Sequence, residues 1–152
     1  MATNNRTMKK ILLLLCLVCG LQIGKCQTSG DNEIIVDSTN FRQVIETLLD
    51  DGYVIDKYDS TLGYISTQIK TIPKHNASVK IRVHIKNGNA YITGVYRVGI
   101  AQYSLVPGFF DRAGSYPVVY YRSALSTSRA CWNEIKNLAL HINSKIEFTK
   151  LQ

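Results

Sequence analysis

Cysteine and proline are scarce in this 152-residue chain once its N-terminal segment, up to Cys26, is set aside. Cys16, Cys19 and Cys26 all lie in that segment, so Cys131 stands alone beyond it and no internal disulfide can form there. Three prolines and no internal repeats or low-complexity tracts argue against a fibrous or disordered body. No later apolar run is long enough to span a bilayer. The chain after Cys26 therefore has to be held together by a hydrophobic core.

The segment from Met1 to Cys26 has the pattern of a signal for export. Three basic residues and no acidic residue precede an apolar run over residues 11–21, which is shorter than the roughly 20 residues that a transmembrane helix needs. Gly24 and Cys26 supply small side chains two positions apart, as signal peptidase requires before its cleavage point. We predict a signal peptide over residues 1–26 and an exported protein, periplasmic or secreted, that begins at Gln27.

Cys26 also allows a second form of export, in which the cysteine carries a lipid and tethers the protein to a membrane. A lipoprotein signal needs a small residue directly before the acylated cysteine, and Lys25 fits that position poorly. We therefore favour soluble export and keep a lipidated Cys26 as the alternative.

Removal of the signal lowers the net charge of the protein. Four of the 18 basic residues lie in the signal, so 14 remain against 11 acidic residues, and the net charge falls from +7 to +3. So small a charge gives little of the counterion-release affinity on which nucleic-acid binding depends, and we expect no nucleic-acid partner. An exported domain of this size without disulfides is more typical of a bacterial cell envelope than of a eukaryotic secreted module.

Hydrophobic periodicity predicts two helices after a flexible leader over residues 27–32. Apolar side chains three and four positions apart predict a helix over residues 41–49, with Ser38 or Thr39 as its N-cap. A second apolar stripe predicts a helix that begins at about Ser126.

Alternation of apolar and polar residues predicts the strands. The clearest one, over residues 79–86, has an apolar side and a polar side, and Asn87-Gly88 then predicts a tight hairpin turn. The polar side of this strand carries Lys80, Arg82, His84 and Lys86. Further strands are predicted over residues 33–36, 53–59, 64–72, 90–98 and 145–150. We predict one α+β domain over residues 33–152, an antiparallel sheet of four to six strands with two helices packed on one face.

The segment FRQVIETLLDDGYVIDKYDSTLGYIST, residues 41–67, combines an amphipathic helix, Gly-Tyr, a strand, a tight turn and Gly-x-Ile-x-Thr. It resembles the repeating domain of the outer-membrane assembly lipoprotein BamC and small envelope proteins of unknown function from Bacteroidetes. The resemblance implies a helix-grip fold, in which a curved antiparallel sheet wraps a helix. It also implies a non-enzymatic role as an accessory or scaffold module of the envelope.

The sequence holds no pattern typical of catalysis or metal binding. Cys131 lies beside Trp132 on a helix with an apolar stripe, which favours a buried residue over a nucleophile. The three histidines are scattered and no paired cysteines occur, so we expect no metal, no cofactor and no enzymatic activity.

Three short motifs suggest modification. Ser38 and Ser60 lie in Asp-Ser-Thr tripeptides that look like the O-glycosylation pattern of Bacteroidetes, and both also suit a helix cap or a turn. Asn76-Ala77-Ser78 is a formal N-glycosylation sequon.

The segment from residue 99 to residue 121 has more aromatic bulk than a connector needs. It either folds over the open sheet face and buries its rings or forms a surface for a partner. With the arginine that follows it, its candidate binding residues are Tyr103, Phe109, Phe110, Arg112, Tyr116, Tyr120 and Arg122.

These observations predict a non-enzymatic binding or accessory module of the envelope, whose partner is an envelope protein. The alternative is a carrier of a small apolar ligand or lipid, held in a cleft under the 99–121 loop. A further hypothesis is that the strand face of Lys80, Arg82 and Lys86 meets anionic lipid or glycan, against the simpler interpretation of a solvated sheet face.

Overall fold

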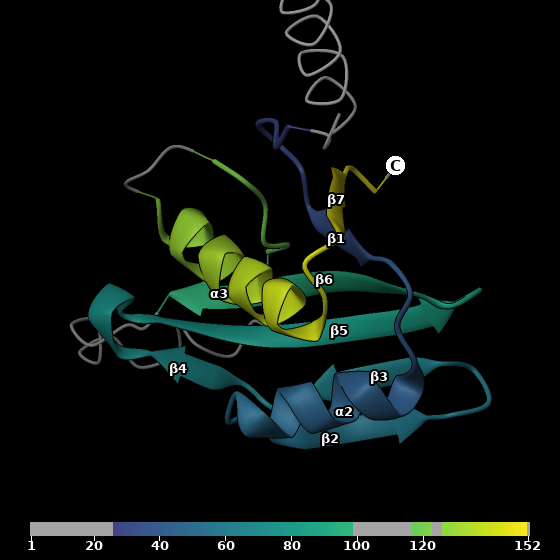
Figure 1. Cartoon of the computed structure of the whole chain (residues 1–152). Helices are drawn as coiled ribbons and strands as arrows, with labels where there is room; N and C mark the ends of the chain where they lie inside the picture. The colour runs from purple at the N-terminus through teal and green to yellow at the C-terminus, as the bar shows by residue number, and fades with distance from the viewer. Residues whose placement is uncertain (1–25, 99–116, 123–125, 152) are drawn as a thin grey trace, which may run out of the picture.

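An antiparallel sheet with two helices on one face forms the protein (Figure 1). The computed structural model describes residues 26–98, 117–122 and 126–151. In chain order the elements are β1 (Glu33–Val36), α2 (Phe41–Asp50), β2 (Ile55–Asp59), β3 (Tyr64–Thr67), β4 (Lys70–Ile72), the short 3-10 helix η1 (Pro73–His75), β5 (Ala77–Lys86), β6 (Asn89–Val98), α3 (Thr127–Ile142) and β7 (Ile146–Thr149). The predicted α+β class is confirmed, and within the described ranges the sheet has seven strands rather than four to six.

The β5–β6 hairpin is the centre of the sheet. The two strands pair along their whole length, and the turn residues Asn87 and Gly88 both have positive φ, 54° and 76°, as the predicted tight turn requires. The strand order is β2-β3-β5-β6-β1-β7, with β4 also paired to β5. The first and last of these strands in the chain, β1 and β7, are therefore neighbours.

The extra strand arises where the predicted strand 64–72 divides into β3 and β4, which both pair with β5. At the division the buried hydroxyl of Thr67 accepts a hydrogen bond from the backbone N–H of Ile81 at 3.0 Å. A side chain thus takes the place of a backbone acceptor, and the chain can leave the ladder without an unsatisfied donor.

The N-cap of α2 is Asn40, so the prediction of Ser38 or Thr39 is wrong. The Asn40 Oδ1 accepts from the backbone N–H of Gln43 at 2.9 Å. Ser38 has a φ of 52°, and the N–H of Thr39 donates to the Gly88 carbonyl at 2.8 Å. Ser38 and Thr39 therefore form the turn between β1 and α2, and Asn40 is the residue that has the extended conformation of an N-cap.

The core lies between the helices and the sheet face that they cover. α3 supplies Trp132, Ile135 and Leu138, all buried, and the apolar side of β5 faces them. A Cβ at Gly94 in β6 would overlap the terminal methyl group of Ile135, so the glycine leaves room for this α3 side chain against the sheet.

Residues 28–32, predicted as part of the leader, carry several hydrogen bonds. Asp31 accepts from the backbone N–H and the hydroxyl of Thr28 at 2.6 and 2.8 Å. The Gly30 N–H donates to the Tyr121 carbonyl, and the Tyr121 N–H donates to the Asp31 carbonyl. The hydrogen-bonded part of the domain therefore extends back to Thr28, before the predicted boundary at residue 33. None of the helices in the described ranges is long and apolar enough to cross a membrane.

Candidate functional site

The face of the sheet opposite the helices carries the candidate site. Alternation along β5 turns Val83 into the core and Arg82 and His84 out of it. The register places Tyr64 of β3, His84 of β5 and Tyr91 of β6 in one row across three strands. Paired side chains on one sheet face lie about 5 Å apart, so these three rings form a continuous surface.

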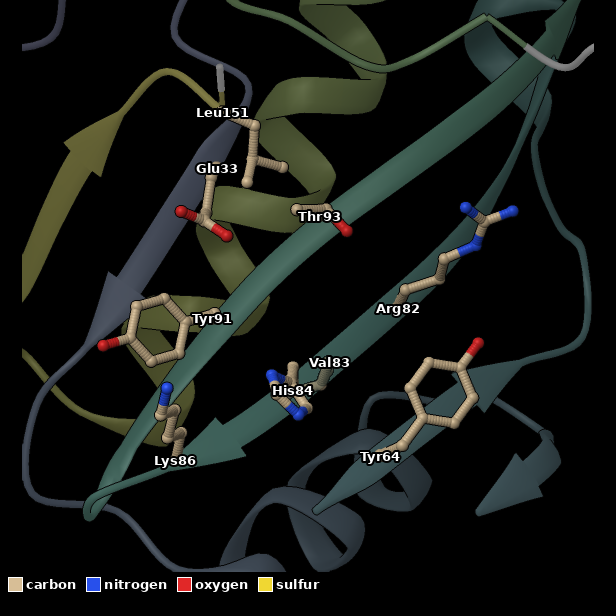
Figure 2. A pocket seen from close by; sticks show the side chains of 9 residues that line it. All are labelled: Glu33, Tyr64, Arg82, Val83, His84, Lys86, Tyr91, Thr93 and Leu151. Atoms are coloured by element: carbon tan, nitrogen blue, oxygen red, sulfur yellow. The ribbon is translucent and has the colours of Figure 1, made fainter. Parts of the chain in front are cut away.

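A hollow of about 590 Å³ lies in this surface. Figure 2 shows the side chains that line it. Tyr64 with Arg82 lies on one side of His84, and Tyr91 with Lys86 lies on the other. β1 adds a carboxyl group and the C-terminal residues add an apolar side chain. The lining residues are Glu33, Tyr64, Arg82, Val83, His84, Lys86, Tyr91, Thr93 and Leu151.

Within the described ranges, the hollow holds two cations that no carboxylate pairs with. Arg82 and Lys86 are exposed, and neither has an ion-pair partner in that part of the chain. Lys80, on the same strand face, binds Asp56 with its Nζ 2.8 Å from Oδ2. The basic face considered from the sequence therefore reduces to Arg82 and Lys86.

His84 lies between the two groups of lining residues and is held by the β2–β3 turn. Its Nε2 lies 3.1 Å from the carbonyl oxygen of Leu62, so Nε2 donates to that oxygen. The neutral ring then has Nδ1 as an acceptor, and His84 can accept a hydrogen bond from a ligand hydroxyl.

Glu33 gives the hollow a carboxyl group. The residue is 9% exposed, and burial raises the pKa of its carboxyl above the usual value. In the described ranges no hydrogen bond or ion pair engages this carboxyl group. Because Glu33 lines the same hollow as Arg82 and Lys86, the hollow presents groups of both charge signs.

Most of the binding residues predicted from the aromatic segment lie outside the described residues: Tyr103, Phe109, Phe110, Arg112 and Tyr116. Tyr120 and Arg122 are described, and the Arg122 guanidinium donates to the Tyr120 hydroxyl at 2.9 Å. Neither residue lines the hollow. The predicted apolar cleft under this segment depends on residues 99–116 and stays a prediction.

The described end of the aromatic segment belongs to the fold. Val119 is fully buried and its N–H donates to the Gly94 carbonyl at 2.8 Å, which extends the sheet past the end of β1. The Tyr121 ring packs edge-on against Trp132, with the Arg129 guanidinium 4.1 Å from its centroid. Val119 and Tyr121 are therefore part of the packed fold, on the side of the sheet that α3 covers.

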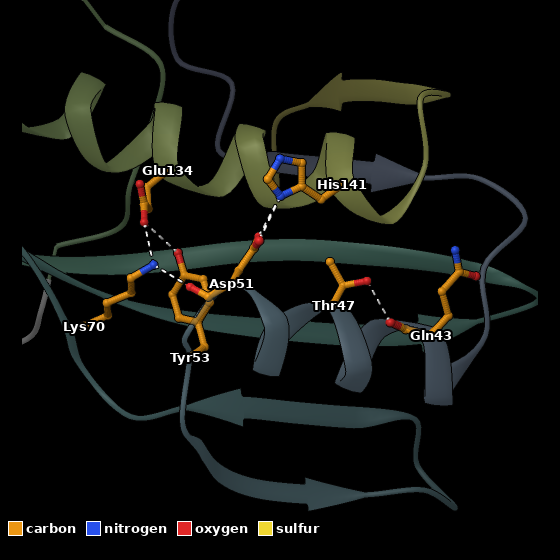
Figure 3. A network of polar contacts seen from close by, with 7 residues as sticks. All are labelled: Gln43, Thr47, Asp51, Tyr53, Lys70, Glu134 and His141. Carbon is orange, nitrogen blue, oxygen red and sulfur yellow. Dashed lines mark hydrogen bonds and ion pairs between the residues drawn. The ribbon is translucent and has the colours of Figure 1, made fainter.

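A polar network ties α2, β4 and α3 together (Figure 3). The Lys70 Nζ binds Glu134 and the Asp51 carbonyl, both at 2.9 Å, and lies over the Tyr53 ring. Burial first, and then the Glu134 charge, raise the pKa of the Tyr53 hydroxyl well above its usual range. His141 binds the Asp51 carboxylate at 2.8 Å. Since these groups satisfy one another, the network is a structural link between the helices.

The lone described core cysteine and two of the histidines do not come together in one site. Cys131 is fully buried, and burial raises the pKa of its thiol to about 11, which keeps it protonated near neutral pH. His84 and His141 bind Leu62 and Asp51 instead. The described ranges contain no group of three His, Cys, Asp or Glu residues that could hold a metal ion.

The residues considered for modification are exposed. Cys26 is exposed, as are Ser38 at the turn before α2 and Ser60 in the β2–β3 turn. The Asp59 carboxylate accepts from the backbone N–H groups of Thr61 and Leu62, which explains Asp-Ser-Thr at that turn on structural grounds alone.

Neither a protein-family model nor a curated protein sequence matches this chain. Function therefore has to be inferred from the hollowed sheet face, where Arg82 and Lys86 lie beside two tyrosine rings.

Proposed function

We propose that this chain is a non-enzymatic, exported binding module of a bacterial cell envelope, and that it binds through the helix-free face of its sheet. One observation carries the proposal: the hollow of about 590 Å³ brings two cations without carboxylate partners in the described ranges, Arg82 and Lys86, together with Tyr64 and Tyr91. Arginine and tyrosine are among the residue types most enriched where binding energy concentrates. A solvated sheet face needs neither the rings nor the concavity.

Binding is favoured over catalysis by the state of the reactive groups. The Cys131 thiol is buried and protonated, and the Nε2 of His84 is engaged by a backbone carbonyl. The thiol is therefore not placed to act as an activated nucleophile, and His84 keeps only its Nδ1 as a hydrogen-bond acceptor in the hollow. Export is supported by the signal pattern of residues 1–26 and by the lone cysteine beyond it.

The test is retention of the purified protein on isolated envelope. The double variant Arg82→Ala/Lys86→Ala removes both cations of the hollow, and Lys74→Ala/Lys145→Ala is its matched control because it removes the same charge from exposed sites outside the hollow. We expect the first variant to lose at least 10-fold in co-sedimentation with the envelope, and the control to behave as the wild type.

All four substituted side chains are exposed, so the free energies of unfolding of both variants should lie within about 0.5 kcal/mol of the wild type. Equal co-sedimentation of the two double variants would overturn the proposal, since retention would then follow net charge rather than the hollow.

A further inference from the structure

The mixed polarity of the hollow restricts the chemistry of its ligand. Arg82 and Lys86 attract anions, whereas Glu33 lines the same hollow and opposes them. A ligand whose polar groups are all phosphates or sulfates is repelled by the ionised carboxyl group of Glu33. A ligand that also carries hydroxyl donors can give hydrogen bonds to Glu33, to the Nδ1 of His84 and to the hydroxyl of Thr93.

The two cations are far apart along the strand. Arg82 and Lys86 are four residues apart on β5, which places their Cα atoms about 13 Å from each other in an extended strand. Figure 2 shows the two side chains on opposite sides of His84, so in this arrangement they do not converge on one small anion. The spacing fits separate anionic groups along a chain, and the planar Arg82 guanidinium is suited to bind a carboxylate through two hydrogen bonds.

The rings lie across the strands. Tyr64 and Tyr91 stand on β3 and β6 with β5 between them, so their Cα atoms are about 10 Å apart. Both are half-buried and project from the sheet on either side of His84 (Figure 2). A span of this length exceeds one pyranose ring, so a ligand that contacts both tyrosines has to be at least a disaccharide.

We propose, as a deepening of the binding function above and dependent on it, that the hollow binds a polysaccharide whose acidic groups are carboxylates. Its carboxylates pair with Arg82 and Lys86, its sugar rings stack on Tyr64 and Tyr91, and its hydroxyls donate to Glu33. Charge complementarity selects an anionic ligand. The rings and the carboxyl group select a carbohydrate over a bilayer surface, which offers the hollow charge but no rings to stack.

The proposal is tested by calorimetric titration of the purified protein with four probes. These are polygalacturonate, neutral dextran, dextran sulfate and vesicles containing phosphatidylglycerol. We expect polygalacturonate to bind at least 10-fold more tightly than each of the others at physiological ionic strength. Dextran sulfate also has sugar rings but carries sulfates in place of carboxylates, so its tighter binding would show that charge density and not the carboxylate governs binding. Tighter binding of the vesicles would show a membrane-surface ligand. Either result would overturn the proposal.

Tyrosine variants test the stacking. Tyr64→Ala and Tyr91→Ala should each weaken polygalacturonate binding about 10-fold, whereas Tyr91→Phe should retain it because the ring is kept. Tyr58→Ala is the matched control, since Tyr58 is 66% exposed and lies outside the hollow. Unchanged binding in both alanine variants of the hollow would refute a carbohydrate ligand.

Glu33 provides a readout that loss of folding cannot imitate. Glu33→Gln keeps the shape of the side chain and removes its charge, so it should lower the preference for polygalacturonate over dextran sulfate by at least 3-fold. An unchanged preference would contradict the role given to this carboxyl group. If polygalacturonate fails to bind while Arg82→Ala/Lys86→Ala still abolishes envelope retention, the carbohydrate proposal fails and the binding function stands.

Discussion

Two turn glycines with the same backbone conformation should differ sharply in their tolerance of alanine. Gly63 in the β2–β3 turn and Gly88 in the β5–β6 turn have φ values of 64° and 76°. A Cβ at Gly88 meets no atom within 4 Å, whereas a Cβ at Gly63 collides with the carbonyl oxygen of Ile85. The pair therefore separates the cost of positive φ from the cost of a close backbone approach.

The magnitudes follow from these surroundings. An L-residue in the left-handed region costs about 1–2 kcal/mol, and the lower entropy of the unfolded chain returns about 0.4–1 kcal/mol, so Gly88→Ala should destabilise by about 1 kcal/mol. Gly63→Ala must also push the turn away from β5. The hydrogen bond from the Ile85 N–H to the Gly63 carbonyl, 2.7 Å long, is then strained or lost. The positive φ costs about 1 kcal/mol as at Gly88, the lost hydrogen bond about 1 kcal/mol and the displacement of the turn a similar amount, so Gly63→Ala should destabilise by about 3 kcal/mol in total.

Urea unfolding followed by circular dichroism measures both variants. We expect the midpoint of Gly63→Ala to fall well below that of Gly88→Ala, with a difference of about 2 kcal/mol in the free energy of unfolding. If the two variants agree within about 0.5 kcal/mol, the turn relaxes without loss, and the reasoning from the close approach to Ile85 is refuted.

Four further predictions concern titratable groups and cysteines. Above pH 10 the free energy of unfolding should fall with pH, because the raised pKa of Tyr53 keeps its proton in the folded state only; Tyr53→Phe should flatten this dependence. Glu33→Gln should raise the free energy of unfolding at pH 7, since burial disfavours the ionised carboxyl group. Cys131→Ala should cost about 1 kcal/mol and leave envelope retention intact, and iodoacetamide should label Cys131 only after unfolding. The intact mass of the mature protein should equal that of a chain that begins at Gln27. A chain that begins at Cys26 with an added lipid mass would show acylation of that cysteine.

Local patterns in the sequence were sufficient to predict most of the helices and strands, but not the residues at which they begin and end. The alternation over residues 79–86 and the Asn87-Gly88 turn predicted the β5–β6 hairpin because both are local signals. The N-cap moved to Asn40 because Thr39 binds the carbonyl of Gly88, which lies much later in the chain. Such a contact cannot be inferred from the periodicity of residues 41–49, where the helix was predicted.

The site was only partly accessible to sequence reasoning. The polar side of β5 was evident, and a hairpin centred on Asn87-Gly88 places His84 opposite Tyr91 by counting alone. Glu33 could not be found in this way, because β1 reaches the site by pairing with β6, a strand far from it in the sequence. The ion pair of Lys80 with Asp56 could not be found in this way either, because Asp56 lies on β2 and β3 separates β2 from β5 in the sheet.

The pairing of the first strand with the last has a consequence for when the protein can fold. β1 lies between β6 and β7, and Asn32 binds the backbone of Leu151, 119 residues away. When a chain emerges N-terminus first from a ribosome or a membrane pore, β1 emerges long before β6 and β7, the two strands that it pairs with. The sheet can close only after β7 is released, so this order of strands delays folding until transit of the domain is complete.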